Sequence, residues 1–173
     1  MSVYGRRWQD ESVLDGPTPE IAFVTTFLVS SSVDQVFTHL SDPHSYIGLS
    51  PLIVAVDDVR ISRDAEGRTV TDYVAVERFR FLRLLRWDNR IRVRMVTTRP
   101  GAQLVSDVVS PARVRLRAVV DLTAEETGTR VQERVTATAP ALLRRFVTGQ
   151  ARQVAAYRAA ELTRRMNGQA ESA

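Results

Sequence analysis

The sequence of 173 residues contains no cysteine and no lysine. Without cysteine, the chain has no disulfides, no thiolate metal ligands and no thiol nucleophile. All 24 basic residues are arginine and stand against 20 acidic residues, so the formal net charge is only +4. A net charge of this size does not by itself indicate a nucleic-acid partner, and we expect none.

Long apolar runs are also missing. The longest, residues 52–56, is far too short to span a bilayer. No apolar segment follows Arg6 and Arg7, as it would in a secretory signal. Together with the absence of cysteine, these features predict a cytoplasmic protein.

Histidine is scarce, and the only two, His39 and His44, flank Asp42 and Pro43. A zinc or iron site needs further nitrogen, sulfur or carboxylate ligands at a suitable geometry. The sequence also has no glycine-rich phosphate loop and no Gly-x-Ser-x-Gly nucleophile motif. We therefore expect no metal site and no cofactor.

Hydrophobic periodicity divides the chain into three parts. Residues 1–19 show no periodicity and are expected to form an irregular N-terminal arm, whereas residues 20–166 form one domain and residues 167–173 a frayed tail. The domain opens with a strand, Ile21–Val29, that is rich in β-branched and aromatic residues. A short helix follows, ends at Asp42-Pro43 because the residue before proline avoids helical geometry, and leads into a second short helical turn.

Period-two alternation then predicts six strands joined by short turns, a pattern typical of antiparallel hairpins. Their expected bounds are residues 52–62, 68–79, 88–98, 103–109, 113–122 and 129–138. After Pro140 the apolar period becomes that of a helix, which is expected to run to about Met166 and to end at Asn167-Gly168.

This order of elements predicts an α+β fold. A curved, seven-stranded antiparallel sheet, with its first strand paired to its last, would wrap around the long C-terminal helix and use it to cover the apolar face. Because a strongly curved sheet cannot close fully on a single helix, we expect an internal cavity lined by the inward-facing side chains of both.

The segment from Val29 to Pro43 resembles the opening signature of the START-like, or SRPBCC, superfamily, and within it the polyketide cyclase/dehydrase-like branch. It contains a strand, a cap of small residues, a helix with Val36-Phe37, and Asp42 before a helix breaker. The resemblance covers about residues 20–166 and implies a helix-grip fold with a hydrophobic ligand cavity. Lipid carriers, hormone sensors and aromatase/cyclases share this fold, so the resemblance does not decide the chemistry.

We expect the protein to bind or carry a hydrophobic small molecule, such as a lipid or a polyketide-like aromatic compound, in that cavity. The expected lining residues are Phe23, Phe27, Tyr46, Tyr73, Met95, Leu116, Glu133, Phe146, Val154 and Tyr157. Glu133 follows the inward alternation of its strand, whereas neither face of the strand that carries Tyr73 is purely apolar, which leaves its orientation open. In the alternative function, an aromatase/cyclase or dehydratase would use Tyr73 and Glu133 as acid and base. The sequence does not specify an oligomeric state.

Residues 78–87 interleave four arginines with apolar side chains that include Phe79, Phe81 and Trp87. These three aromatic residues are expected at the entrance to the cavity, between two strands at the open end of the grip. Three interpretations stay open for the segment: a hairpin with its aromatics in the core or entrance, a peripheral contact with an anionic membrane, and a protein interface.

Two rows of arginine, at residues 90, 92 and 94 and at residues 113, 115 and 117, alternate with apolar residues and are expected on the outer face of the sheet. Acidic residues on neighbouring strands, among them Asp107 and Asp121, would neutralise them. The rows contain no aromatic residues on which bases could stack. We therefore expect a solvated surface of mixed charge.

Overall fold

A computed structural model describes residues 21–81, 85–111 and 113–170. The predicted arm at residues 1–19 lies outside these ranges. The elements are β1 (Ile21–Val29), α1 (Val33–Ser41), the 3₁₀ turn η1 (Pro43–Tyr46), β2 (Ile53–Arg63), β3 (Thr69–Phe81), β4 (Leu85–Arg99), β5 (Gln103–Val109), β6 (Arg115–Glu125), β7 (Gly128–Thr138), the 3₁₀ turn η2 (Ala141–Leu143) and α2 (Arg144–Ala170).

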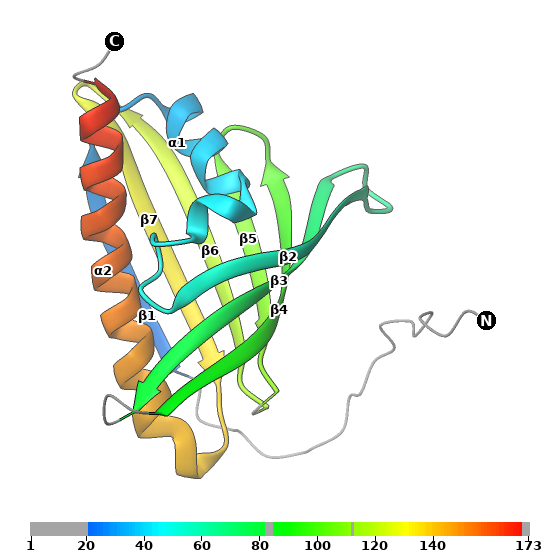
Figure 1. Ribbon diagram of the computed structural model, residues 1–173. Helices are drawn as coiled ribbons and strands as arrows, with labels where there is room; N and C mark the ends of the chain where they lie inside the picture. The colour runs from blue at the N-terminus through cyan, green and yellow to red at the C-terminus, as the bar shows by residue number, and fades with distance from the viewer. Residues whose placement is uncertain (1–20, 82–84, 112, 171–173) are drawn as a thin grey trace.

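The seven strands form one antiparallel sheet in the order β1-β7-β6-β5-β4-β3-β2. The sheet is curved, and α2 runs along it beside β1 and β7 (Figure 1). β1 pairs with β7 along its whole length, from Ile21 opposite Ala137 to Val29 opposite Thr129. The predicted α+β helix-grip architecture is thereby confirmed.

The link from β1 to α1 is set by local side-chain hydrogen bonds. Ser32 caps α1, because its hydroxyl accepts a hydrogen bond from the Gln35 backbone and the Gln35 side chain accepts one from the Ser32 backbone. Asp42 ends α1 and caps η1 through the His44 N–H at 2.9 Å. The predicted helix end before Pro43 is confirmed.

The inner face of the sheet alternates as the sequence predicts. Ile91, Val93 and Met95 are buried on β4, while Arg90 and Arg92, on either side of Ile91, are exposed. The register pairs Tyr73 with Val93 and Ala75 with Ile91, which settles the orientation of β3. The face that carries Tyr73 points inward, and Glu77 and Phe79 therefore lie on the same face.

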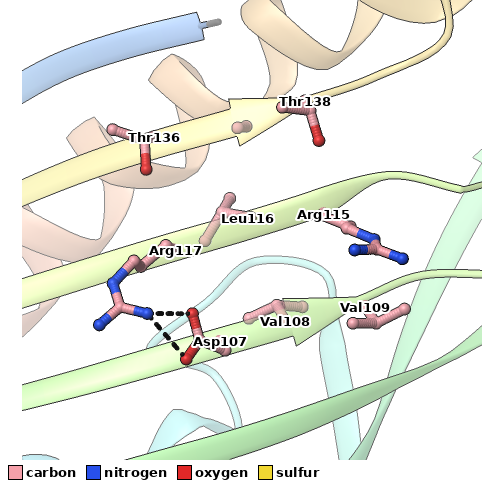
Figure 2. A pocket seen from close by; sticks show the side chains of 9 residues that line it. Asp107, Val108, Val109, Arg115, Leu116, Arg117, Thr136 and Thr138 are labelled. Carbon is pink, nitrogen blue, oxygen red and sulfur yellow. Dashed lines mark hydrogen bonds and ion pairs between the residues drawn. The ribbon is translucent and has the colours of Figure 1, made fainter. Parts of the chain in front are cut away.

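The outer face carries paired charges. Arg117 on β6 points toward Asp107 on β5 above a shallow hollow that Thr136 and Thr138 of β7 also line (Figure 2). The Arg117 Nη1 lies 3.0 and 3.1 Å from the two carboxylate oxygens of Asp107. Asp121 similarly accepts hydrogen bonds from Arg99 and Arg134, each at 2.6 Å. These pairs match the expected mixed-charge surface.

The long helix α2 extends further than the sequence predicts. It continues through Asn167 and Gly168 to Ala170, so the prediction that the helix ends at Asn167-Gly168 and leaves a tail from residue 167 is wrong for residues 167–170. The reason is tertiary. The Asn167 Oδ1 accepts a hydrogen bond from the Ser30 N–H at 3.0 Å, and the Met166 carbonyl accepts one from the Ser31 hydroxyl at 2.8 Å. These bonds hold the end of the helix against the turn between β1 and α1.

The two halves of α2 are packed differently. In the second half, Leu162 and Met166 are fully buried in the core. In the first half, Phe146 keeps 51% of its surface exposed and Tyr157, near the middle, keeps 44%. The large apolar side chains of the helix are therefore fully buried only in its second half, although the small Ala155 is also buried.

Candidate functional site

A pocket of about 270 Å³ lies between the first half of α2 and the inner face of the sheet. Most of its lining is apolar and comes from both walls: Phe23, Leu52, Phe79, Trp87, Ile91, Val108, Val114, Leu116, Val135, Leu143, Phe146, Val147, Ala151 and Val154. Five polar residues complete it: Glu77, Asn89, Ser110, Gln150 and Arg158. A mainly apolar cavity with a few polar groups is the usual form of a small-molecule site.

Four of the ten predicted lining residues contribute to this pocket, namely Phe23, Leu116, Phe146 and Val154. They come from β1, β6 and α2, which the topology brings together. The pocket thus brings Phe23 together with Phe146 and Val154, which lie more than 120 positions later in the sequence.

Two of the three predicted entrance residues also line the pocket. Phe79 and Trp87 face each other across the β3–β4 pair, with ring centroids 5.9 Å apart and an interplanar angle of 33°. Trp87 is 55% exposed, which places it at the boundary between pocket and solvent. The side chain of Phe81 lies outside the described residues.

The other predicted lining residues lie elsewhere. Tyr46, Tyr73 and Met95 are buried in the main core, and Phe27 packs against it. Tyr157 is half-exposed and does not line the pocket. The physical reason is that Leu162 and Met166 bring the second half of α2 directly onto the core, so side chains fill that end of the interior.

Glu133 faces inward, as its alternation predicts, and is only 4% exposed. It does not line the pocket but binds Arg158, whose Nη2 donates a hydrogen bond to the Glu133 Oε1 at 2.5 Å. Arg158 does line the pocket. Its Nε is buried and has no hydrogen-bond partner among the described residues. The pair therefore links β7 to α2.

Glu77 on β3, Asn89 on β4 and Ser110, directly after β5, form a polar group that was not among the predicted site residues. The Asn89 amide donates to the Glu77 Oε2 at 3.1 Å and to the Ser110 hydroxyl at 3.3 Å. Burial raises the pKa of Glu77, and the hydrogen bond from Asn89 partly opposes that rise. The alternation of the strands could have identified both residues. Glu77 lies two positions from the inward-facing Ala75, and Asn89 lies two positions from the inward-facing Ile91, and residues two positions apart on a strand share a face.

The two buried tyrosines, Tyr46 and Tyr73, are neutral at physiological pH. Burial raises the pKa of Tyr46 to about 12 and raises the pKa of Tyr73 as well. The Tyr46 hydroxyl donates to the Leu40 carbonyl at 3.2 Å, which joins η1 to α1. Tyr73 belongs to the core between Val93 and Ala75 and does not reach the pocket lining.

Within the described ranges, no group of three or more His, Asp or Glu side chains is arranged to hold a metal ion. His44 instead lies beside Asp42, with 3.3 Å between the Nδ1 and Oδ1 atoms. None of the helices described is both long enough and apolar enough to cross a bilayer.

No protein-family model matches the sequence. No curated protein matches it in sequence either. The fold, in contrast, is similar to known structures. A START superfamily protein from Mycobacterium smegmatis has a TM-score of 0.67 at 12% identity, and the match covers 86% of this chain and 98% of that one.

Two di-domain ARO/CYC proteins have the same fold. StfQ, from the steffimycin biosynthetic pathway, has a TM-score of 0.61 at 12% identity, and BexL, from the BE-7585A pathway, has 0.60 at 15%. The matches cover 89% and 87% of this chain but only 52% and 51% of theirs, so the chain spans about half the length of either protein. At such low identities these similarities show the fold alone, which is START-like.

Proposed function

We propose that the protein binds a compact hydrophobic small molecule in the pocket between α2 and the sheet. The observation that carries this proposal is the apolar cavity itself, which remains because the first half of α2 is not packed onto the core. Open apolar volume of this size forfeits packing energy in the free protein, and a bound apolar molecule would recover it.

The volume limits the size of the ligand. A cavity of roughly 150 Å³ accommodates benzene, and pockets for drug-sized compounds start at roughly 300 Å³. At about 270 Å³ the pocket suits a molecule of one or two fused rings, or a short branched chain. Phe79 and Trp87 at the edge would pack against the ligand.

The catalytic alternative receives less support. An aromatase/cyclase or dehydratase that used Tyr73 and Glu133 would need both groups beside the substrate, within hydrogen-bond reach of the reacting atoms. Tyr73 lies in the core and Glu133 is engaged by Arg158, so neither lines the cavity. The geometry therefore favours ligand binding over acid–base catalysis by Tyr73 and Glu133.

The proposal is tested by filling the pocket from within. Ala151 lines the pocket, whereas Ala156 on the same helix is exposed, so Ala151→Trp and Ala156→Trp form a matched pair. Equilibrium dialysis with 2-ethylnaphthalene, a purely apolar two-ring probe, should show binding to the wild type and to Ala156→Trp. We expect binding to Ala151→Trp to be weaker by about tenfold or more, because the indole occupies the apolar space. Equal binding to all three proteins, or no binding to any, would refute the proposal.

A further inference from the structure

We propose that the pocket selects compact apolar ligands that carry a protonated amine, and that the carboxylate of Glu77 binds this amine. The inference rests on the proposed function, since it concerns the same pocket, and it names the chemical class of the ligand. Three observations support it: an oxygen of Glu77 that the pocket can reach, a carboxylate charge that no described residue compensates, and aromatic side chains on the same wall.

One carboxylate oxygen of Glu77 is open to the pocket. The Oε2 atom accepts the hydrogen bond from the Asn89 amide at 3.1 Å, whereas the Oε1 atom has no partner among the described residues. Glu77 lines the pocket, and its Oε1 is not one of the described polar atoms that protein encloses completely without a partner. A ligand in the pocket can therefore reach this oxygen and donate a charge-assisted hydrogen bond to it.

No positive charge in the described part of the chain compensates Glu77. Arg158, the other charged residue of the described lining, is already paired with Glu133 at 2.5 Å. Burial raises the pKa of Glu77 and the Asn89 hydrogen bond opposes that rise, but no arginine or histidine of the described ranges lowers it further. A partly buried carboxylate without a counter-ion is unfavourable, and a cationic ligand would supply the missing charge.

Aromatic side chains lie on the same wall as Glu77. Glu77 pairs with Asn89, and two positions away along each strand Phe79 pairs with Trp87. All four residues line the pocket, and the centroids of the two rings are 5.9 Å apart. Aromatic rings attract cations to their electron-rich faces. A carboxylate beside two such rings therefore favours an ammonium group over a neutral or a negative one.

The rest of the lining determines the remainder of the ligand. Apart from Glu77 and a few other polar residues it is apolar, and it comes from both the sheet and α2. The volume of about 270 Å³ admits a two-ring hydrocarbon with a short aminoalkyl group. An anionic ligand is disfavoured, because it would place a second negative charge near Glu77 in a poorly solvated space.

Three probes of nearly equal size that differ in one terminal group test the proposal. 2-Ethylnaphthalene ends in a methyl group, 2-naphthalenemethanol in a hydroxyl, and 2-naphthalenemethanamine in an amine that is protonated at pH 7. Equilibrium dialysis at pH 7 should show that the amine binds about tenfold more tightly than the alcohol, because its hydrogen bond to Glu77 joins two charged groups. Equal affinities, or tighter binding of the alcohol, would overturn the inference. The proposed function is judged separately, by the binding of 2-ethylnaphthalene.

A matched pair of variants assigns the preference to Glu77. Glu77→Gln keeps the size of the side chain and one acceptor oxygen but removes the charge, so the ratio of amine to alcohol affinity should fall from about ten to about one. Glu126→Gln makes the same charge change in the exposed turn between β6 and β7 and should keep the ratio. If the preference persists in Glu77→Gln, or is lost equally in both variants, Glu77 does not bind the amine and the inference fails.

Discussion

At the scale of single residues, Glu77 shows most directly how the fold alters the chemistry of a side chain. It places a carboxyl group on an apolar inner wall, and burial raises its pKa. Such a shift means that the folded protein binds a proton more tightly than the unfolded chain. The protonated group therefore stabilises the fold below the ordinary pKa of about 4.5, and this contribution is lost as the pH rises through the folded pKa.

Glu77→Gln should consequently raise the melting temperature at pH 7, because the neutral amide avoids the desolvation of a carboxylate. The gain over the wild type should shrink as the pH is lowered toward 4.5, because the raised pKa makes Glu77 take up its proton more readily in the folded protein than in the unfolded chain. Thermal melts between pH 4 and 8 measure the difference. Glu126→Gln, in the exposed turn between β6 and β7, is the control and should show no such trend. A difference for Glu77→Gln that does not change with pH would contradict the prediction.

At the scale of elements, the turn between β6 and β7 depends on one glycine. Gly128 has φ +145, and a Cβ atom there would lie 2.0 Å from the Val29 carbonyl oxygen of β1. Both the backbone conformation and the close approach of a neighbouring strand exclude a side chain. Gly67, between β2 and β3, has φ +76 but nothing within 4 Å of its Cβ position.

The two glycines allow a matched comparison. Gly67→Ala should cost only the backbone strain of a positive φ, about 1–2 kcal/mol. Gly128→Ala should cost about 1–3 kcal/mol more, since β1 must move away from the new methyl group. Urea unfolding of the two variants gives both values. Equal losses of stability would show that β1 does not approach Gly128 as closely as described.

At the scale of the whole molecule, the ion pair between Glu133 and Arg158 connects the two layers. Glu133 comes from the sheet and Arg158 from α2, 25 positions later. Their side chains are only 5% and 21% exposed, so solvent screens the pair weakly. Arg158 also lines the pocket, whereas Glu133 does not.

Removal of one partner of the Glu133–Arg158 pair should therefore lower the stability of the protein. Arg158→Met should lower the free energy of unfolding by about 3–5 kcal/mol, because it leaves the Glu133 carboxylate buried alone. The double variant Glu133→Leu with Arg158→Met should recover most of that loss, since apolar replacement of a buried pair is often neutral. Denaturant unfolding measures both. If the double variant is no more stable than Arg158→Met alone, the cost arises from packing and not from the unpaired charge.

The strands and helices of this protein were predictable because local patterns specify them. Alternation along residues 88–98 distinguishes the buried Ile91 from the exposed Arg92, and the break at Asp42-Pro43 ends α1. The position of Glu133 on the inner face followed from the same alternation. The C-terminus of α2 was not predictable, because its last turn depends on a contact between Asn167 and Ser30, far apart in the sequence.

The sequence by itself determined the order of elements and the inward and outward faces of most strands, because period and turn chemistry are local properties. Only the tertiary structure decided where the interior is filled and where it is empty. Leu162 and Met166 close one half of the space under α2, and the other half stays open. That difference arises from side chains of several strands packing at once, and for this reason Glu77 and Arg158 line the pocket while Tyr73 lies in the core.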